Sequence, residues 1–438
     1  MVTPPKLPAN DSLPPAMRTI VVWIGVFAAI VVAVLSLPTF LSGPANPPQA
    51  APAEPVLTAS NAAELCEQLF TEPREYISGD AQRRRWALRA ESCQKAFEAD
   101  PANTRLKVNF ARNLPYERKA EAIAMYREAA ALGNAEAYYQ LYEHHKSWDR
   151  GDLDKVPLVT RTEAGQALHK AAELGHPYAT RLLAVLLDRG DTVKRDPVAA
   201  RYWAERALNN PDKDASKGDL MVLLGRLLVT SDKPDERTRG LDLLERTANA
   251  GVFGAKRELA TAIRKQDPVR ARNLLEEARR PDPGGAIAPL AEMLIAGEGG
   301  PADPKRALSM LKGTSDNWMA KGMLGQLTFE GKLVQRDLQE ALNLIERAAT
   351  WEMQARLQVV RLLAEHPELR VGYPKSTLYW ATEAAELGEP GAMDALIRLK
   401  LSDNPQFRDR PGACKLIEAA VSRGDQSMAQ RLTDCRAS

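Results

Sequence analysis

The sequence of 438 residues has few aromatic side chains and almost no net charge, and the lack of charge excludes one class of partner. Phe, Trp and Tyr together make up 6% of the residues, and 59 basic side chains against 57 acidic ones leave a formal charge of +2. Because nucleic-acid-binding proteins need an excess of positive charge to neutralise phosphates, we expect no nucleic acid partner.

Motifs of the common catalytic and cofactor sites are also missing. The stretch GEGGPADPK lacks the order G-x-x-x-x-G-K-S/T of a phosphate-binding loop, and neither H-E-x-x-H nor G-x-S-x-G occurs. There are only five histidines, and the adjacent His144 and His145 would diverge by about 100° on a helix, which is a poor arrangement for sharing one metal. We therefore expect no enzymatic activity, no catalytic residue, no metal site and no cofactor.

One apolar stretch differs from the rest of the chain. Residues 19–41, TIVVWIGVFAAIVVAVLSLPTFL, contain no charged side chain and are long enough to cross about 30 Å of hydrocarbon. The alternative is a cleaved secretory signal, whose apolar core is shorter, about 7 to 15 residues. Lys6 and Arg18 precede the stretch, and no basic residue follows it before Arg74. The positive-inside rule therefore predicts a single-pass inner-membrane protein with a cytoplasmic N-terminus and the bulk of the chain in the periplasm.

Four cysteines test this orientation. Cys66 and Cys93 are centred on the turn sequence ISGD, and Cys414 and Cys435 are centred on SRGDQ. Residues equidistant from the turn of an antiparallel helical hairpin lie at the same height, as a disulfide requires. We expect two disulfides, one near each end of the exported region, and hence an oxidising compartment. The alternative is four unpaired buried thiols.

The region after residue 57 is repetitive and helical throughout. Helices that end in small residues and a turn recur, with clear glycine examples at Gly133, Gly175, Gly251, Gly388 and Gly424. With degenerate versions included, the turns fall near positions 133, 175, 211, 251, 282, 316, 352, 388 and 424. A period of this length indicates a solenoid, in which each helical hairpin buries its apolar face against the next. We found no strand-like alternation of useful length, and so expect an all-α protein.

Composition and periodicity together divide the chain into six expected regions. They are a proline-rich cytoplasmic tail (1–18), a transmembrane helix (19–41), a proline-rich linker (42–57), an N-terminal helical cap (58–115), the repeat array (116–424) and a C-terminal capping helix (425–438).

The repeat pattern resembles the Sel1-like family, relatives of the tetratricopeptide repeats. The best example is residues 164–207, in which KAAELG is followed by LLDRG and then DPVAARYWAERAL. The resemblance implies a right-handed superhelical solenoid of about ten hairpins whose concave groove binds envelope proteins. Proteins of this kind act as scaffolds, including in exopolysaccharide secretion machinery. The alternative is a periplasmic regulator that binds and restrains a membrane sensor kinase.

Two clusters of side chains are further candidates for contacts, and the groove residues themselves stay unassigned. Arg83, Arg84, Arg85 and Arg89 could bind an acidic polymer or lipid surface, or could form a solvated helix face. A helix with three tyrosines could stack on a sugar or a peptide, or fill space between hairpins; its aromatic residues are Tyr138, Tyr139, Tyr142 and His144. A polysaccharide contact is thus left open.

Overall fold

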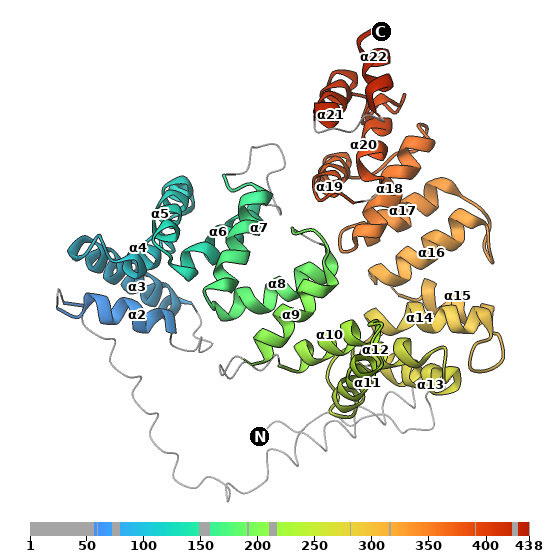
Figure 1. Cartoon of the computed structure of the whole chain (residues 1–438), viewed down its shortest axis with the longest axis horizontal. Coiled ribbons are helices and arrows are strands. Elements are labelled where there is room, and N and C mark those ends of the chain that lie inside the picture. The colour runs from blue at the N-terminus through green and yellow to red at the C-terminus, as the bar shows by residue number, and fades with distance from the viewer. Residues whose placement is uncertain are drawn as a thin grey trace, which may run out of the picture. The chain divides into compact units, whose positions relative to one another are not determined.

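The computed structural model consists, in the part of the chain that it describes, of α-helices joined by turns (Figure 1). No strand occurs within the described residues, which are 57–58, 60–71, 79–148, 158–190, 192–209, 217–280, 282–314, 317–389, 391–422 and 428–437. The predicted transmembrane helix at residues 19–41 lies outside these ranges. None of the described helices is both long and apolar enough to cross a membrane.

Twenty-one α-helices, α2 to α22, and one short 3₁₀ helix follow each other along the described residues. They are α2 (Ala62–Thr71), α3 (Asp80–Ala99), α4 (Thr104–Ala111), η2 (Tyr116–Arg118), α5 (Lys119–Ala131), α6 (Ala135–Trp148), α7 (Arg161–Glu173), α8 (Pro177–Arg189), α9 (Pro197–Leu208), α10 (Lys217–Val229), α11 (Pro234–Asn249), α12 (Ala255–Ile263), α13 (Pro268–Ala278), α14 (Pro283–Ala296), α15 (Pro304–Lys312), α16 (Trp318–Glu330), α17 (Leu338–Ala349), α18 (Met353–Glu365), α19 (Pro374–Glu386), α20 (Ala392–Leu401), α21 (Arg410–Ser422) and α22 (Ala429–Ala437).

The predicted all-α array of about ten hairpins is therefore confirmed, whereas the right-handed superhelical course stays a prediction. Each helix packs on the next one in sequence, and even-numbered helices also contact even-numbered neighbours, as in the pairs α10–α12, α12–α14 and α14–α16. This pattern is typical of a solenoid, because every repeat buries its apolar face only against its neighbours.

Glycine turns end four odd-numbered helices in the same way. At Gly175, which has φ 83°, the N–H of His176 donates to the carbonyl of Ala171 at 2.9 Å and the N–H of Gly175 donates to that of Ala172 at 3.0 Å. These two bonds define a Schellman motif, which needs a residue in the left-handed region at the turn. The motif recurs at Gly133, Gly251 and Gly388.

Aspartate–proline pairs begin four other helices. Asp196 accepts hydrogen bonds from the backbone N–H groups of Val198 and Ala199, and Pro197 occupies the first turn, where its missing N–H costs nothing. The same arrangement begins α13, α14 and α15, with the caps Asp267, Asp282 and Asp303. The sequence D-P-x-x-A thus fixes where these four helices start.

Small residues let neighbouring helices approach closely, as the sequence suggested. Gly225 on α10 faces Gly240 on α11, and a Cβ added at Gly240 would lie 2.8 Å from the carbonyl oxygen of Gly225. Alanines with no exposed surface fill equivalent positions in other pairs; examples are Ala129, Ala171, Ala204, Ala271 and Ala348. Larger side chains at these positions would separate the helices and open voids in the core.

Disulfides join the helices of the first and the last pair. Cys66 on α2 bonds to Cys93 on α3, with Cα atoms 4.8 Å apart, and Cys414 on α21 bonds to Cys435 on α22, with Cα atoms 5.7 Å apart. Both pairings are those expected from the symmetric spacing about the turns. Because such bonds persist only under oxidising conditions, they indicate an extracytoplasmic location for the helical array.

A buried charge network connects two helices that are far apart in the sequence. Arg161, at the start of α7, lies 3.3 Å from Glu383 and 2.9 Å from Glu386, both on α19. The hydroxyl of Tyr379 accepts a hydrogen bond from the same guanidinium at 2.5 Å. Arg356 of α18 also binds Glu383, at 2.7 Å. The side chain of Arg161 thus joins α7 to α19, although eleven helices separate them in the chain.

Candidate protein-binding surface

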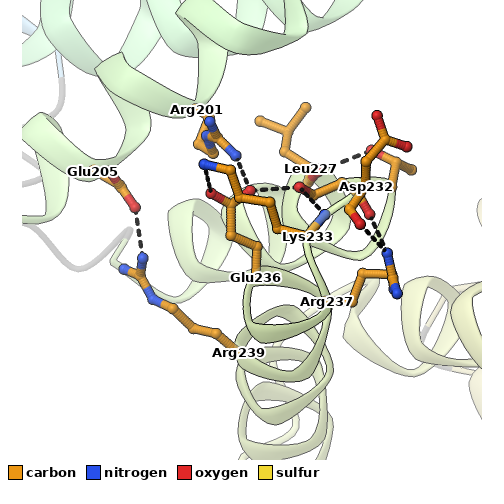
Figure 2. Close-up of polar contacts among 10 residues, drawn as sticks. Arg201, Glu205, Leu227, Asp232, Lys233, Glu236, Arg237 and Arg239 are labelled. Carbon is orange, nitrogen blue, oxygen red and sulfur yellow. Dashed lines mark hydrogen bonds and ion pairs between the residues drawn. The ribbon is translucent and has the colours of Figure 1, made fainter.

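The odd-numbered helices carry a ladder of ion pairs from one repeat to the next. Figure 2 shows the step from α9 to α11, where Arg201 pairs with Glu236, and Glu205 lies 2.7 Å from Arg239. Equivalent pairs join α5 to α7, α11 to α13 and α13 to α15; they are Arg127–Glu163, Glu245–Arg270 and Glu276–Arg306. Since exposed pairs contribute little free energy each, we interpret the ladder as setting the register between repeats.

Glu236 is the most strongly perturbed carboxylate of this ladder. Ser231 donates a hydrogen bond to it at 2.5 Å. Lys233 donates another at 3.2 Å (Figure 2). These contacts, with the charge of Arg201, lower the pKa of Glu236 to about 2. The carboxylate is thus fully used in holding the turn before α11, and offers little to a partner.

The even-numbered helices form a pocket near the N-terminal end of the array. Its volume is about 750 Å³, and it is open to solvent on one side. The lining comes from α2, α4, α6 and the start of α8, with their flanking turns; it consists of Glu67, Phe70, Arg105, Val108, Asn109, Arg112, Asn134, Glu136, Tyr139, Gln140, His176 and Tyr178. We call these residues the α4–α6 pocket.

A charge network lies at the bottom of the α4–α6 pocket. Glu136 lies 3.2 Å from Arg112 and 2.9 Å from Nε2 of His176. Nδ1 of His176 accepts the backbone N–H of Ala179 at 3.2 Å and so caps α8. The ring therefore carries its proton on Nε2, which donates to Glu136. Burial by itself raises the pKa of Glu136, but the bonds from His176 and Gln140 and the charge of Arg112 outweigh it, and the pKa is lowered.

Aromatic rings form one wall of the same pocket. The rings of Tyr139 and His176 are stacked with centroids 4.5 Å apart, and Tyr178 lies 6.5 Å from Tyr139. Burial, together with the carboxylate of Glu143, raises the pKa of Tyr139, so its hydroxyl stays protonated. Tyr178 is 62% exposed. A half-buried stack that ends in an exposed tyrosine resembles the energetic centres of protein interfaces.

The opposite wall is built around Phe70. The guanidinium of Arg112 lies 4.4 Å from the ring centroid of Phe70, and that of Arg89 lies 4.7 Å from it. Arg89 also donates a hydrogen bond to Asn113 at 2.9 Å. Such cation–π contacts hold a guanidinium in place without neutralising its charge. The pocket thus combines fixed cations, a carboxylate and aromatic faces.

The structure divides the two side-chain clusters that the sequence singled out. Of the basic cluster, Arg89 supports the wall of the pocket, Arg83 pairs with Asp80 within α3, and Arg84 and Arg85 also lie on α3. Of the aromatic helix α6, Tyr142 is 3% exposed and belongs to the core, and His144 packs against Tyr126 with ring centroids 5.4 Å apart. Filling between hairpins therefore explains those two residues, whereas Tyr139 faces the pocket.

A second pocket, of about 610 Å³, lies beside the buried network between α7 and α19. Tyr138, Arg161, His169 and Lys194 are among its lining residues, and Glu386 closes it from α19. Of its lining the sequence singled out only Tyr138, and it did not indicate the pocket, because at least 190 residues separate Glu386 and Leu387 from the other side. Within the described ranges, no group of three or more metal-ligating side chains is present in this pocket or elsewhere.

Comparisons with known proteins agree with this architecture. A model of the Sel1 repeat family matches residues 118–134, 177–212, 286–312 and 319–350. The second match spans α8 and α9, and the fourth spans α16 and α17. These segments, about a quarter of the chain, are similar to Sel1 repeats and lie within an all-helical solenoid. Each repeat pairs an even-numbered helix with the odd-numbered helix that follows it.

Several solved structures are similar to the chain. A Sel1 repeat protein from Oxalobacter formigenes is 21% identical over 76% of this chain and 99% of that one, with a TM-score of 0.34. A protective antigen of uropathogenic Escherichia coli strains, which displays an SLR fold, is 19% identical over 86% of this chain and 79% of that one, with a TM-score of 0.39. Yeast Tom70 is 12% identical over 86% of this chain and 88% of that one, with a TM-score of 0.37. No curated protein matches the sequence.

Proposed function

We propose that the chain is a scaffold that residues 19–41 anchor in the inner membrane, and whose Sel1-repeat array binds other envelope proteins in the periplasm. Assembly of envelope or exopolysaccharide-export machinery is the role that fits this arrangement. In this proposal the chain carries out no chemical reaction of its own. The observation that carries the proposal is the α4–α6 pocket, which presents interface-type residues on a repeat array.

The chemistry of the pocket favours a protein as the partner. Tyrosine and arginine are enriched among the residues that dominate protein–protein binding energies. Arg112 and Glu136 are held in place before binding, so a partner would lose little free energy in ordering them. The Arg105–Glu67 pair, with 2.9 Å between its charged atoms, lies at the more exposed edge, as the polar rim of an interface does.

The location follows from two independent features. The charge distribution around residues 19–41 predicts that the array is exported, and the two disulfides need an oxidising compartment. A proline-rich linker, residues 42–57, would keep the array away from the bilayer surface, where it can meet other envelope proteins.

Site-specific crosslinking in cells tests the proposal. A photoreactive amino acid is placed at Tyr178 in the pocket or, as a matched control, at Tyr116, which is 74% exposed on η2 and does not line the pocket. We expect a defined set of envelope proteins to crosslink from position 178 and not from position 116. The same products from both positions would contradict the assignment of the pocket. Recovery of one sensor kinase would replace the scaffold by the regulatory alternative.

A further inference from the structure

A third pocket differs from the others in its aromatic content. It has a volume of about 800 Å³ and lies between α16, α17 and the start of α19. Four of the twelve lining residues are Trp or Tyr, in a chain with 6% aromatic residues. They are Trp318, Trp351, Tyr373 and Trp380, and we call this site the tryptophan groove.

Two of these rings face the solvent. Trp351 is 69% exposed and Tyr373 is 71% exposed. Large apolar rings that stay in water next to a hollow are typical of binding sites, because burying them would release free energy that folding has left unused. Trp318 and Trp380 are half-buried and form the deeper part of the groove.

Buried contacts hold the exposed rings in position. The carboxylate of Glu346, which is 8% exposed, accepts the backbone N–H of Gly372 at 3.2 Å and that of Tyr373 at 3.1 Å. These bonds fix the loop that presents the Tyr373 ring. The N–H of Trp351 donates to the carbonyl of Ala348 at 3.0 Å and fixes the turn after α17. The groove is thus organised before any ligand arrives.

Hydrogen-bond donors outnumber acceptors along the groove. The indole N–H groups of Trp318 and Trp351, the ammonium group of Lys321 and the guanidinium of Arg347 have no partner within the described part of the chain. Asn343 uses its carbonyl oxygen to accept from Gln339 at 3.0 Å, which leaves its amide N–H groups facing outward. Glu346 is occupied by backbone, so Glu340 supplies the one remaining carboxylate of the lining.

A ligand that matches this groove must therefore offer acceptors and flat apolar surfaces, and few donors. A polyproline II strand has these properties, because proline has no N–H, its carbonyl groups point outward, and its rings pack on aromatic side chains. Its conformation is also formed before binding, which lowers the entropic cost. A neutral sugar fits less well, because its hydroxyl groups would add further donors to a lining in which Glu340 supplies the one remaining carboxylate.

We propose that the tryptophan groove binds a proline-rich segment of a partner protein in the polyproline II conformation. This site lies on repeats that do not contribute to the α4–α6 pocket, so the two can be tested separately.

Titration calorimetry on the full-length protein tests the proposal, with decaproline as the probe. We expect saturable binding of decaproline and no binding of a peptide of ten serines, which carries the same number of carbonyl groups without the preformed conformation. Equal binding of the two peptides, or binding of neither, would overturn the proposal. Saturable binding of a neutral or uronic acid oligosaccharide with no binding of decaproline would assign the groove to sugars instead.

Single substitutions identify the site of binding. Trp351→Ala and Tyr373→Ala remove exposed rings, so the fold is retained, and each should weaken decaproline binding about tenfold. Trp86→Ala is the matched control, because Trp86 is 54% exposed on α3, outside the groove. Loss of affinity in the control, or unchanged affinity in both groove variants, would show that the peptide binds elsewhere. Circular dichroism on each variant confirms that the helices are intact.

Discussion

His144 on α6 is a residue whose protonation is linked to stability. Its ring is largely buried against Tyr126, and burial, together with the charge of Lys119, lowers its pKa from 6.5 to about 4. The unfolded chain therefore binds a proton at a higher pH than the folded chain does. The contribution of the neutral His144 ring to the free energy of unfolding is therefore complete above pH 6.5, and it is lost as the pH falls toward 4.

We expect His144→Gln to reduce the acid sensitivity of the protein. Between pH 7 and pH 5 the parent should lose on the order of 1 kcal/mol of unfolding free energy more than the variant does, after allowance for partial exposure of the ring. Urea unfolding at several pH values measures the difference.

Gly175 is the second residue at which a substitution has a clear physical consequence. Its φ of 83° is strained for any side chain, while no atom lies within 4 Å of an added Cβ, so backbone conformation alone decides the cost. We expect Gly175→Val to destabilise the protein by about 1 to 2 kcal/mol, and Gly175→Asn to cost less, because Asn tolerates the left-handed region. Chemical denaturation measures the free energy of unfolding of both variants. An equal loss of unfolding free energy in the two would mean that steric crowding, and not the left-handed φ, causes the destabilisation.

At the scale of helices, the sequence was informative because each boundary has a local chemical cause. Glycine tolerates the left-handed φ of a helix end, Asp caps an N-terminus, and Pro is favoured in the first turn. The turns near 133, 175, 251 and 388 could therefore be predicted to within a residue or two. The sequence did not reveal which two helices make one Sel1 repeat. The glycine turns at Gly133, Gly175, Gly251 and Gly388 lie between two repeats, whereas the sequence analysis placed each of them in the middle of a helical hairpin.

The terminal disulfides act at this same scale. Each closes a short segment, with separations of 27 and 21 residues, on a helix pair that is the first or the last of the described helices. The double variant Cys66→Ser/Cys93→Ser should lose on the order of 3 kcal/mol of protection against hydrogen exchange in α2 and α3. Protection in α21 and α22 should not change, because α2 and α3 pack on each other and on α4, at the opposite end of the array in the sequence. Loss of protection along the whole array would contradict this view.

At the scale of the whole array, the contact of Arg161 with α19 is the feature that the sequence could not predict. The partners are 218 to 225 residues apart, and periodicity reports only on nearest neighbours. The same is true of the pocket beside them. The α4–α6 pocket was partly foreseeable, because Tyr139 belongs to an aromatic helix, but the roles of Phe70 and His176 depend on contacts between separate repeats.

Removing the Arg161 side chain should affect two distant helices at once. Arg161→Ala leaves Glu383 buried with one cationic partner fewer, so hydrogen exchange should increase in α7 and in α19 together. Arg127→Ala is the control, since it removes an exposed pair with Glu163 on the same helix and should leave α19 unchanged. Faster exchange in α7 alone would show that the contact with α19 contributes nothing to stability.

The placement of the cysteines has a consequence for how the protein matures during export. Four cysteines permit three pairings, yet each native bond joins residues fewer than 30 positions apart, and the two pairs lie more than 300 positions apart. In the proposed topology, the part of the chain after residues 19–41 emerges from the translocation channel starting at its N-terminal end, so Cys66 and Cys93 are exposed long before Cys414 follows. The first bond can therefore form while no competing thiol has yet emerged, so correct pairing follows from the order of emergence and requires no later isomerase.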